Sequence, residues 1–193
     1  CQVVNGEVKV GVYAFAQIDT ARRAQIRVHH TSAHLLQAAL IKVLGDEVKQ
    51  AGSQVEENRM RFDFTFSRAM TPQEVKKTED IMNKWIGEKL PVNTDVMGIE
   101  EAKLTGATAL FGEKYEDVVR VVSIGGKAKC NCGSDCSCDH ESGEEKEVIS
   151  KEFCAGTHAS NTADLRLVKI VSEGAIAAGT RRIEAVVADA AID

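Results

Sequence analysis

Two pairs of potential metal ligands, separated by about 120 residues, constrain this chain more than any other feature. His30-x-x-x-His34 and Cys154-x-x-x-His158 each place two ligating side chains one helical turn apart, or within one tight turn. Three imidazoles and one thiolate suit Zn²⁺, which favours nitrogen and sulfur ligands in tetrahedral geometry. The sequence therefore predicts a fold that brings both pairs to one point. The alternative is that the spacing is coincidental, or that a His belongs to the core.

The spacing leaves the role of such a metal open. A closed shell of four protein ligands is typical of structural zinc, whereas catalytic zinc keeps a position for water or substrate. An open position would arise if one protein ligand stayed off the metal, or if the metal became five-coordinate. Gly156, inside the second pair, permits the tight turn that this pair requires.

The length and composition indicate one globular domain of ordinary size. The chain has 193 residues, of which 44% are hydrophobic and 27% charged, and no apolar run approaches the roughly 20 residues of a membrane span. The net charge is −5, so any nucleic-acid contact must use local basic clusters. The chain starts at Cys1 within a strand-like segment, so we expect a piece excised from a longer protein.

Hydrophobic periodicity and capping residues predict three helices. The first runs from about Arg22 to Leu44, with Asp19 or Thr20 as its N-cap and Gly45 as its stop. A capping box at Thr71 opens a second helix that runs to about Leu90 and buries Trp85 in the core. A shorter third helix is predicted over 99–111.

Alternating and buried apolar runs predict the strands. Two short strands are expected over 7–19, and Phe62, Phe64 and Phe66 share one side of a strand over 58–67. Further strands are predicted over 117–124, 148–153, 165–172 and 180–187. Without regular alternation, these elements favour an α+β fold with an antiparallel or mixed sheet packed against helices. We expect residues 1–20 to end a small β subdomain and residues 21–193 to form the main domain.

A Cys-rich segment interrupts this order between 126 and 147, and its composition predicts a flexible insertion. Its potential ligands for a second zinc, or for Cu(I), are Cys130, Cys132, Cys136, Cys138 and His140. Cys-x-Cys spacing is tighter than that of common structural zinc sites, so incidental metal binding is the alternative.

Five ordered blocks carry a family resemblance over nearly the whole chain outside 126–147. They read HHTSAHLLQAAL, QAGSQVEENRMRFDFTFSRAMTPQE, GATALFGEKYEDVVRVVSIG, EFCAGTHASNTADL and VKIVSEGAIAAGTRRIEAV. The chain resembles the editing domain of alanyl-tRNA synthetase and is similar to free-standing alanyl-tRNA editing proteins. Editing domains of threonyl-tRNA synthetase share the two ligand pairs, but the ALFGEKY, SEGAIAAG and RRIEAV blocks resemble the alanyl family.

The resemblance implies an aminoacyl-tRNA ester hydrolase that clears tRNA(Ala) wrongly charged with serine or glycine. It implies one zinc held by His30, His34, Cys154 and His158, with Gln50 and Thr157 at the reaction site. The partners would be the acceptor end of tRNA(Ala) and the other domains of the parent synthetase, with no DNA and no membrane. ATP would bind only to the parent enzyme, outside this chain. The protein would be located in the cytoplasm, or in an organellar matrix if the parent is eukaryotic. The alternative is a non-catalytic module that binds the acceptor end around a structural zinc.

One departure from the family pattern concerns substrate choice. The family often has Thr directly before the second His, whereas this chain has Ala33 there, so a hydroxyl that reads the substrate would be missing. Ser32 or a water substituting for it is the alternative. Basic residues that could meet tRNA phosphates, or lie on a solvated face, are Arg22, Arg23, Arg27, Arg181 and Arg182, of which we expect the last two to bind substrate.

Overall fold

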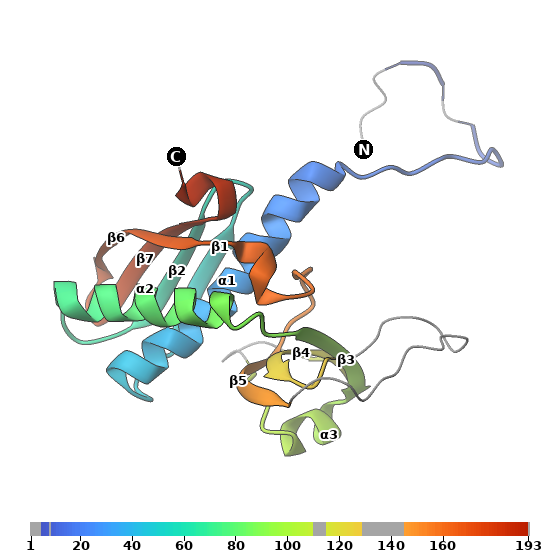
Figure 1. Cartoon of the computed structure of the whole chain (residues 1–193). Coiled ribbons are helices and arrows are strands. Elements are labelled where there is room, and N and C mark those ends of the chain that lie inside the picture. Colours follow the sequence, from blue (N-terminus) through green and yellow to red (C-terminus); the bar gives the residue numbers. More distant parts are fainter. Residues whose placement is uncertain (1–4, 8, 110–114, 129–144, 193) are drawn as a thin grey trace.

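Two antiparallel sheets and three α-helices make up the part of the chain that the computed structural model describes, residues 5–7, 9–109, 115–128 and 145–192. The first sheet has the order β1 (Gln50–Val55), β2 (Met60–Thr65), β7 (Thr180–Val187) and β6 (Val168–Ala177). The second has the order β3 (Val92–Gly98), β4 (Val118–Gly126) and β5 (Lys146–Phe153) (Figure 1). The predicted α+β class is confirmed.

The long helix α1 (Thr20–Leu44) joins the two sheets, because it contacts β1, β2 and β7 of the first and β5 of the second. The Asp19 side chain caps its start by accepting a hydrogen bond from the backbone nitrogen of Arg22. Gly45 ends it with a φ of 102°, a backbone conformation that glycine adopts without a Cβ penalty. Both predicted caps therefore lie where expected, and α1 is placed to present side chains to β5.

The second helix, α2 (Pro72–Gly87), begins at the predicted capping box. Thr71 Oγ1 accepts from the Glu74 nitrogen, and the Glu74 carboxylate accepts from the Thr71 nitrogen. The helix packs on α1 and β6, and Trp85 is buried as predicted. It ends three residues before the predicted end, and α3 (Ile99–Leu104) is likewise shorter than 99–111.

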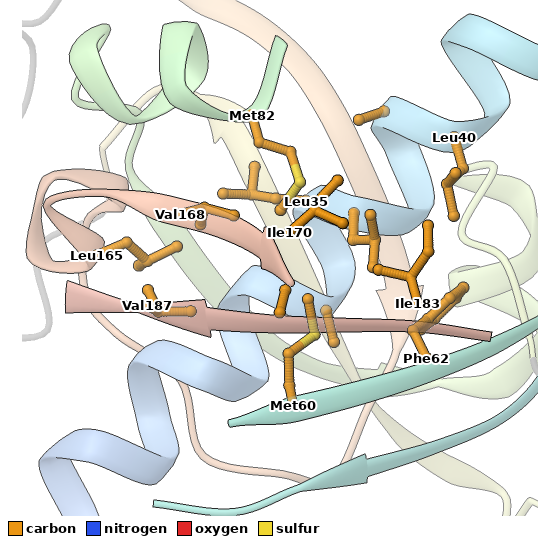
Figure 2. Close-up of a cluster of buried hydrophobic side chains, with 14 of the residues drawn as sticks. Leu35, Leu40, Met60, Phe62, Met82, Leu165, Val168, Ile170, Ile183 and Val187 are labelled. Carbon is orange, nitrogen blue, oxygen red and sulfur yellow. The ribbon is translucent and has the colours of Figure 1, made fainter. Parts of the chain in front are cut away.

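The main hydrophobic core lies between the first sheet and the two long helices. Figure 2 shows Leu35 and Leu40 of α1 and Met82 of α2 facing Phe62 and Ile183 of the sheet. Phe62, Phe64 and Phe66 are all buried, so the predicted alternation in that strand is confirmed. Burying one such side chain contributes about 1.5–3 kcal/mol. A smaller cluster around Val121 and Phe153 holds the second sheet against α3.

Several predicted boundaries were wrong. The described residues between 7 and 19 form no strand and lead away from the sheets before α1 (Figure 1). Val10, Tyr13 and Phe15 in this segment are exposed. A strand needs a partner and a face to bury, and the described residues offer this segment neither. β1 and β3 were not predicted, since polar residues break any apolar alternation in both strands.

The predicted strand over 165–172 begins later, at Val168, because the 3₁₀ helix η1 (Thr162–Leu165) occupies its start. The Cys-rich interruption is shorter than 126–147, because Gly126 belongs to β4 and Lys146 to β5. The predicted second metal site, with Cys130, Cys132, Cys136 and Cys138, lies outside the described residues. The division at residue 20 stays a prediction.

Candidate metal centre

The four predicted ligands meet, although they come from opposite ends of the chain. His30 and His34 lie on one face of α1, and Cys154 and His158 lie on the segment that follows β5. Their ligand atoms all lie within 4.8 Å of one another. The rings of His30 and His34 stack with centroids 5.4 Å apart. The fold therefore builds one group that can bind a metal ion.

The distances inside this group fit a zinc ion. Cys154 Sγ lies 3.3 Å from His158 Nε2 and 3.5 Å from His30 Nε2. Sulfur and nitrogen ligands on one tetrahedral zinc lie about 3.5 Å apart, since the metal bonds are about 2.3 and 2.0–2.1 Å. His34 Nε2 is buried and has no hydrogen-bond partner. Buried polar atoms seldom lack a partner, so this nitrogen is the atom that a metal would satisfy.

Glu152 fixes the orientation of His34. Its Oε2 lies 2.8 Å from His34 Nδ1, and its Oε1 accepts a 2.7 Å hydrogen bond from the Ser150 hydroxyl. Both His34 and Glu152 are buried. Because Glu152 holds a proton on Nδ1, Nε2 is the nitrogen left to bind a metal, which is the arrangement that carboxylate–histidine–metal groups use.

Thr31 holds His158 in a similar way. The Thr31 hydroxyl lies 3.3 Å from His158 Nδ1 and accepts a 3.0 Å hydrogen bond from the backbone nitrogen of Ala159. A proton on His158 Nδ1 can point at this hydroxyl, which leaves Nε2 free for a metal. Thr31 lies between the two His ligands on α1, so one helix turn orients both sides of the group.

The neighbouring histidines stabilise the thiolate form of Cys154, which is the form that binds metals. Burial alone would raise the pKa of this thiol, but hydrogen bonds from His158 and His30 and the charge of His34 lower it to about 3. Burial lowers the pKa of His158 to about 4, and the neighbouring His34 and His30 charges act in the same direction. Burial would also lower the pKa of His34, but Glu152 and the thiolate raise it to about 10. At pH 7 these pKa values favour a Cys154 thiolate, a neutral His158 and a protonated His34, so a metal ion that binds here would displace the proton from His34 Nε2.

Gly156 is required by the close approach of His30. A Cβ built at this position would lie 3.2 Å from His30 Nε2 and closer still to Cε1 and Nδ1. The sequence indicated glycine here for a tight turn. The structure gives a different reason, because the His30 ring occupies the space that any side chain would need.

The other predicted site residues differ in burial, from the exposed Thr157 to the buried Ala33. Thr157 is exposed and sits between Cys154 and His158 in sequence, whereas Gln50 starts β1 and donates a 3.2 Å hydrogen bond to Ser53. Ala33 is 6% exposed and packs in the main core. The Ser32 hydroxyl donates to the backbone oxygen of His29. Their predicted roles at the reaction site stay predictions.

The predicted phosphate-binding arginines are engaged by neighbouring groups. Arg181 makes a two-bond ion pair with Glu173, and Arg182 makes one with Asp63. Arg22 pairs with Glu57, and Arg27 donates to the His158 backbone oxygen. Any phosphate contact by Arg181 or Arg182 must compete with these carboxylates.

Three residues that hold the cluster, Thr31, Glu152 and Arg120, were not singled out from the sequence. Glu152 lies two residues before Cys154, and in an extended chain residues two apart point to the same side. This spacing could have indicated that Glu152 lies near the metal centre. Arg120 of β4 donates to the backbone oxygens of Cys154 and Gly156. No local pattern identifies Arg120, since its contacts depend on the pairing of β4 with β5.

Comparison with known proteins shows which synthetases this chain is similar to. The family described as "Threonyl and Alanyl tRNA synthetase second additional domain" matches residues 119–184, which include β5, nearly all of β4, and the candidate ligands Cys154 and His158. The chain is also 46% identical over 191 residues to alanine–tRNA ligase of Synechococcus sp. (strain JA-3-3Ab). This match covers 99% of the chain and 19% of that ligase, so the chain spans about a fifth of the length of the relative.

Residues 119–184 thus match the second additional domain of threonyl- and alanyl-tRNA synthetases. The similarity to alanine–tRNA ligase extends over almost every residue of the chain. The resemblance read from the five sequence blocks is confirmed. In the described part of the chain, no helix has the length and apolar character needed to cross a membrane.

Proposed function

We propose that this domain hydrolyses tRNA(Ala) wrongly charged with serine or glycine, at a zinc ion held by the four ligands. The observation that carries this proposal is the convergence of these ligands in a centre that solvent reaches. His34 and His158 are buried, whereas His30 and Cys154 are only partly buried. The domain family and the alanyl-type match support a tRNA substrate.

The reaction would be hydrolysis of the ester between the amino acid and the ribose of the terminal adenosine. The water oxygen bonds to the carbonyl carbon, the bond from that carbon to the ribose oxygen breaks, and a proton from the water passes to the ribose oxygen, which leaves as a hydroxyl. A bound zinc would supply Lewis acidity and lower the pKa of a water ligand. The exposed Thr157 hydroxyl would orient water or substrate, and Gln50 would contact the aminoacyl group.

The acceptor end of tRNA(Ala) is the proposed partner, together with other domains of a parent synthetase. Arg23 and the partly buried Arg181 and Arg182 would meet phosphates, as side chains of this type commonly do. The same surface gives no reason to propose DNA or membrane binding. We also propose that the domain works in the cytoplasm, or in an organellar matrix if the parent is eukaryotic.

A second candidate function is supported by the complete ligand shell. Four protein ligands, two of them buried and oriented by Glu152 and Thr31, are typical of structural zinc. In that case the domain would bind the acceptor end without hydrolysis.

A deacylation assay with seryl-tRNA(Ala) separates the two functions. The 193-residue chain is assayed with zinc, after removal of metal by a chelator, and after zinc is restored. Hydrolysis faster than the spontaneous rate, lost on chelation and regained with zinc, is the expected result. Hydrolysis that never exceeds the spontaneous rate at any enzyme concentration would leave the binding module as the remaining function.

A further inference from the structure

The segment 154–159, which carries Cys154 and His158, is held by side chains from other elements. Among the described residues, no backbone–backbone hydrogen bond joins two residues of this segment. Buried backbone groups nevertheless need partners, so the positions of these groups must be fixed in another way.

Arg120 occupies the middle of this arrangement. Its guanidinium donates to the backbone oxygen of Cys154 at 3.1 Å and to that of Gly156, and it reaches Thr94 Oγ1 on β3 at 3.3 Å. The backbone oxygen of Arg120 accepts from the Cys154 nitrogen at 3.0 Å, which extends the β4–β5 ladder by one bond. Arg120 thus fixes the backbone nitrogen and oxygen of Cys154, and also the backbone oxygen of Gly156 in the turn that follows.

The far end of the segment is fixed from α1. Arg27 donates to the backbone oxygen of His158, and Thr31 accepts from the backbone nitrogen of Ala159. Because His30 and His34 lie on the same helix, α1 holds the second ligand pair in register with the first. The guanidinium suits this task, since it presents several donors in a rigid plane.

We infer that Arg120 is a positioning residue of the metal centre, with Arg27 as its weaker counterpart at the other end. Arg120 contacts none of the ligand side chains in this arrangement and acts through the backbone of the segment that carries two of them. The inference rests on the metal site of the proposed function and does not require that the domain hydrolyse anything.

The test measures zinc affinity by competition with a chromophoric chelator, in the 193-residue chain with Cys130, Cys132, Cys136 and Cys138 changed to Ser. We expect Arg120→Gln to weaken zinc binding by about 10–100-fold, the range seen when groups that orient metal ligands are removed. Arg120→Lys should recover part of the affinity, because an ammonium can reach one of the two backbone oxygens. Cobalt-loaded Arg120→Gln should also show a weakened thiolate absorption band.

Asn83→Ala is the matched control. Asn83 also bridges two elements, since it donates to the Val168 backbone oxygen and accepts from the Val168 nitrogen. Its loss should lower the melting temperature without changing zinc affinity. If Arg120→Gln does not fold, the zinc affinities of Arg120→Lys and of the surface variant Arg27→Gln test the inference instead. We expect each of these variants to lose less zinc affinity than Arg120→Gln would. Affinities within twofold of the parent in these variants would overturn the inference, whatever the deacylation assay gives.

Discussion

Replacing Gly156 by Ala should remove one ligand from the metal centre while leaving the fold in place. Gly156 has an ordinary φ, so an added methyl group strains no backbone angle. The methyl carbon would overlap the His30 ring, whose Nε2 would lie 3.2 Å away with two ring atoms nearer. Separations below 3.0 Å are essentially never seen for real Cβ atoms, so the ring or the turn must move.

The size of the effect follows from the loss of one nitrogen ligand. Removing a group that only orients a ligand costs about 10–100-fold in metal affinity, so displacing His30 should cost about 100-fold or more. Zinc at 100 times the dissociation constant stabilises a protein by about 2.7 kcal/mol, and a 100-fold weaker site gains only about 0.4 kcal/mol. The difference, about 2.3 kcal/mol, corresponds to a zinc-induced rise in melting temperature that is smaller by about 5–9 °C.

Thermal unfolding with and without zinc measures this difference directly. Gly87→Ala is the control, because nothing lies within 4 Å of a Cβ at Gly87 and the residue ends α2. This control should keep the full zinc response of the parent chain. If Gly156→Ala retains the zinc response of the parent chain, the close packing of His30 does not hold the ligand in place, and the reasoning is refuted.

Three other changes test separate parts of the structure. Glu152→Gln should weaken zinc binding by about 10–100-fold in chelator competition, because the charged partner of His34 is lost; an unchanged affinity would show that Ser150 and Glu152 do not orient the ligand. Arg68 and the capping bond to Thr71 lower the pKa of Glu74 to about 2, below its ordinary 4.5, so its stabilisation is complete above pH 4.5 and is lost as pH falls toward 2. Glu74→Gln keeps the capping geometry but loses the ion pair with Arg68, so it should lower stability slightly at pH 6 and flatten the acid limb measured by denaturant unfolding; an acid limb as steep as that of the parent would contradict this. Ala33→Thr should change the ratio of seryl- to alanyl-tRNA hydrolysis if position 33 reads the substrate, whereas an unchanged ratio with a lower melting temperature would assign the residue to the core.

The four candidate metal ligands could be picked out from the sequence because their chemistry is local to two short spacings. His30 and His34 share a face of any helix that contains both, and Cys154 and His158 need only a turn. Their meeting could be expected only because a single zinc site explains both pairs. What fixes the geometry is non-local: Glu152 reaches His34, and Arg120 reaches the carbonyl oxygens of Cys154 and Gly156, across strands whose register no short pattern reveals.

The fold shows the same division between local and non-local signals. Asp19, Gly45 and the Thr71–Glu74 capping box mark helix ends through contacts within a few residues, and they were predicted well. β1 escaped prediction because Gln50, Gly52 and Ser53 give no apolar alternation, and it is a strand only through its pairing with β2. The apolar residues over 7–19 led to the opposite error, a strand prediction where the structure has none. Alternation indicates a strand only where another element covers its apolar face.

X-ray absorption spectroscopy of the chain loaded with one equivalent of zinc tests the central claim most directly. The structure predicts a mixed shell, with one sulfur at about 2.3 Å and three nitrogens at about 2.0–2.1 Å, because only Cys154 among the four clustered ligands supplies sulfur. A shell of sulfur alone would place the metal on the other cysteines and contradict the centre built from His30, His34, Cys154 and His158.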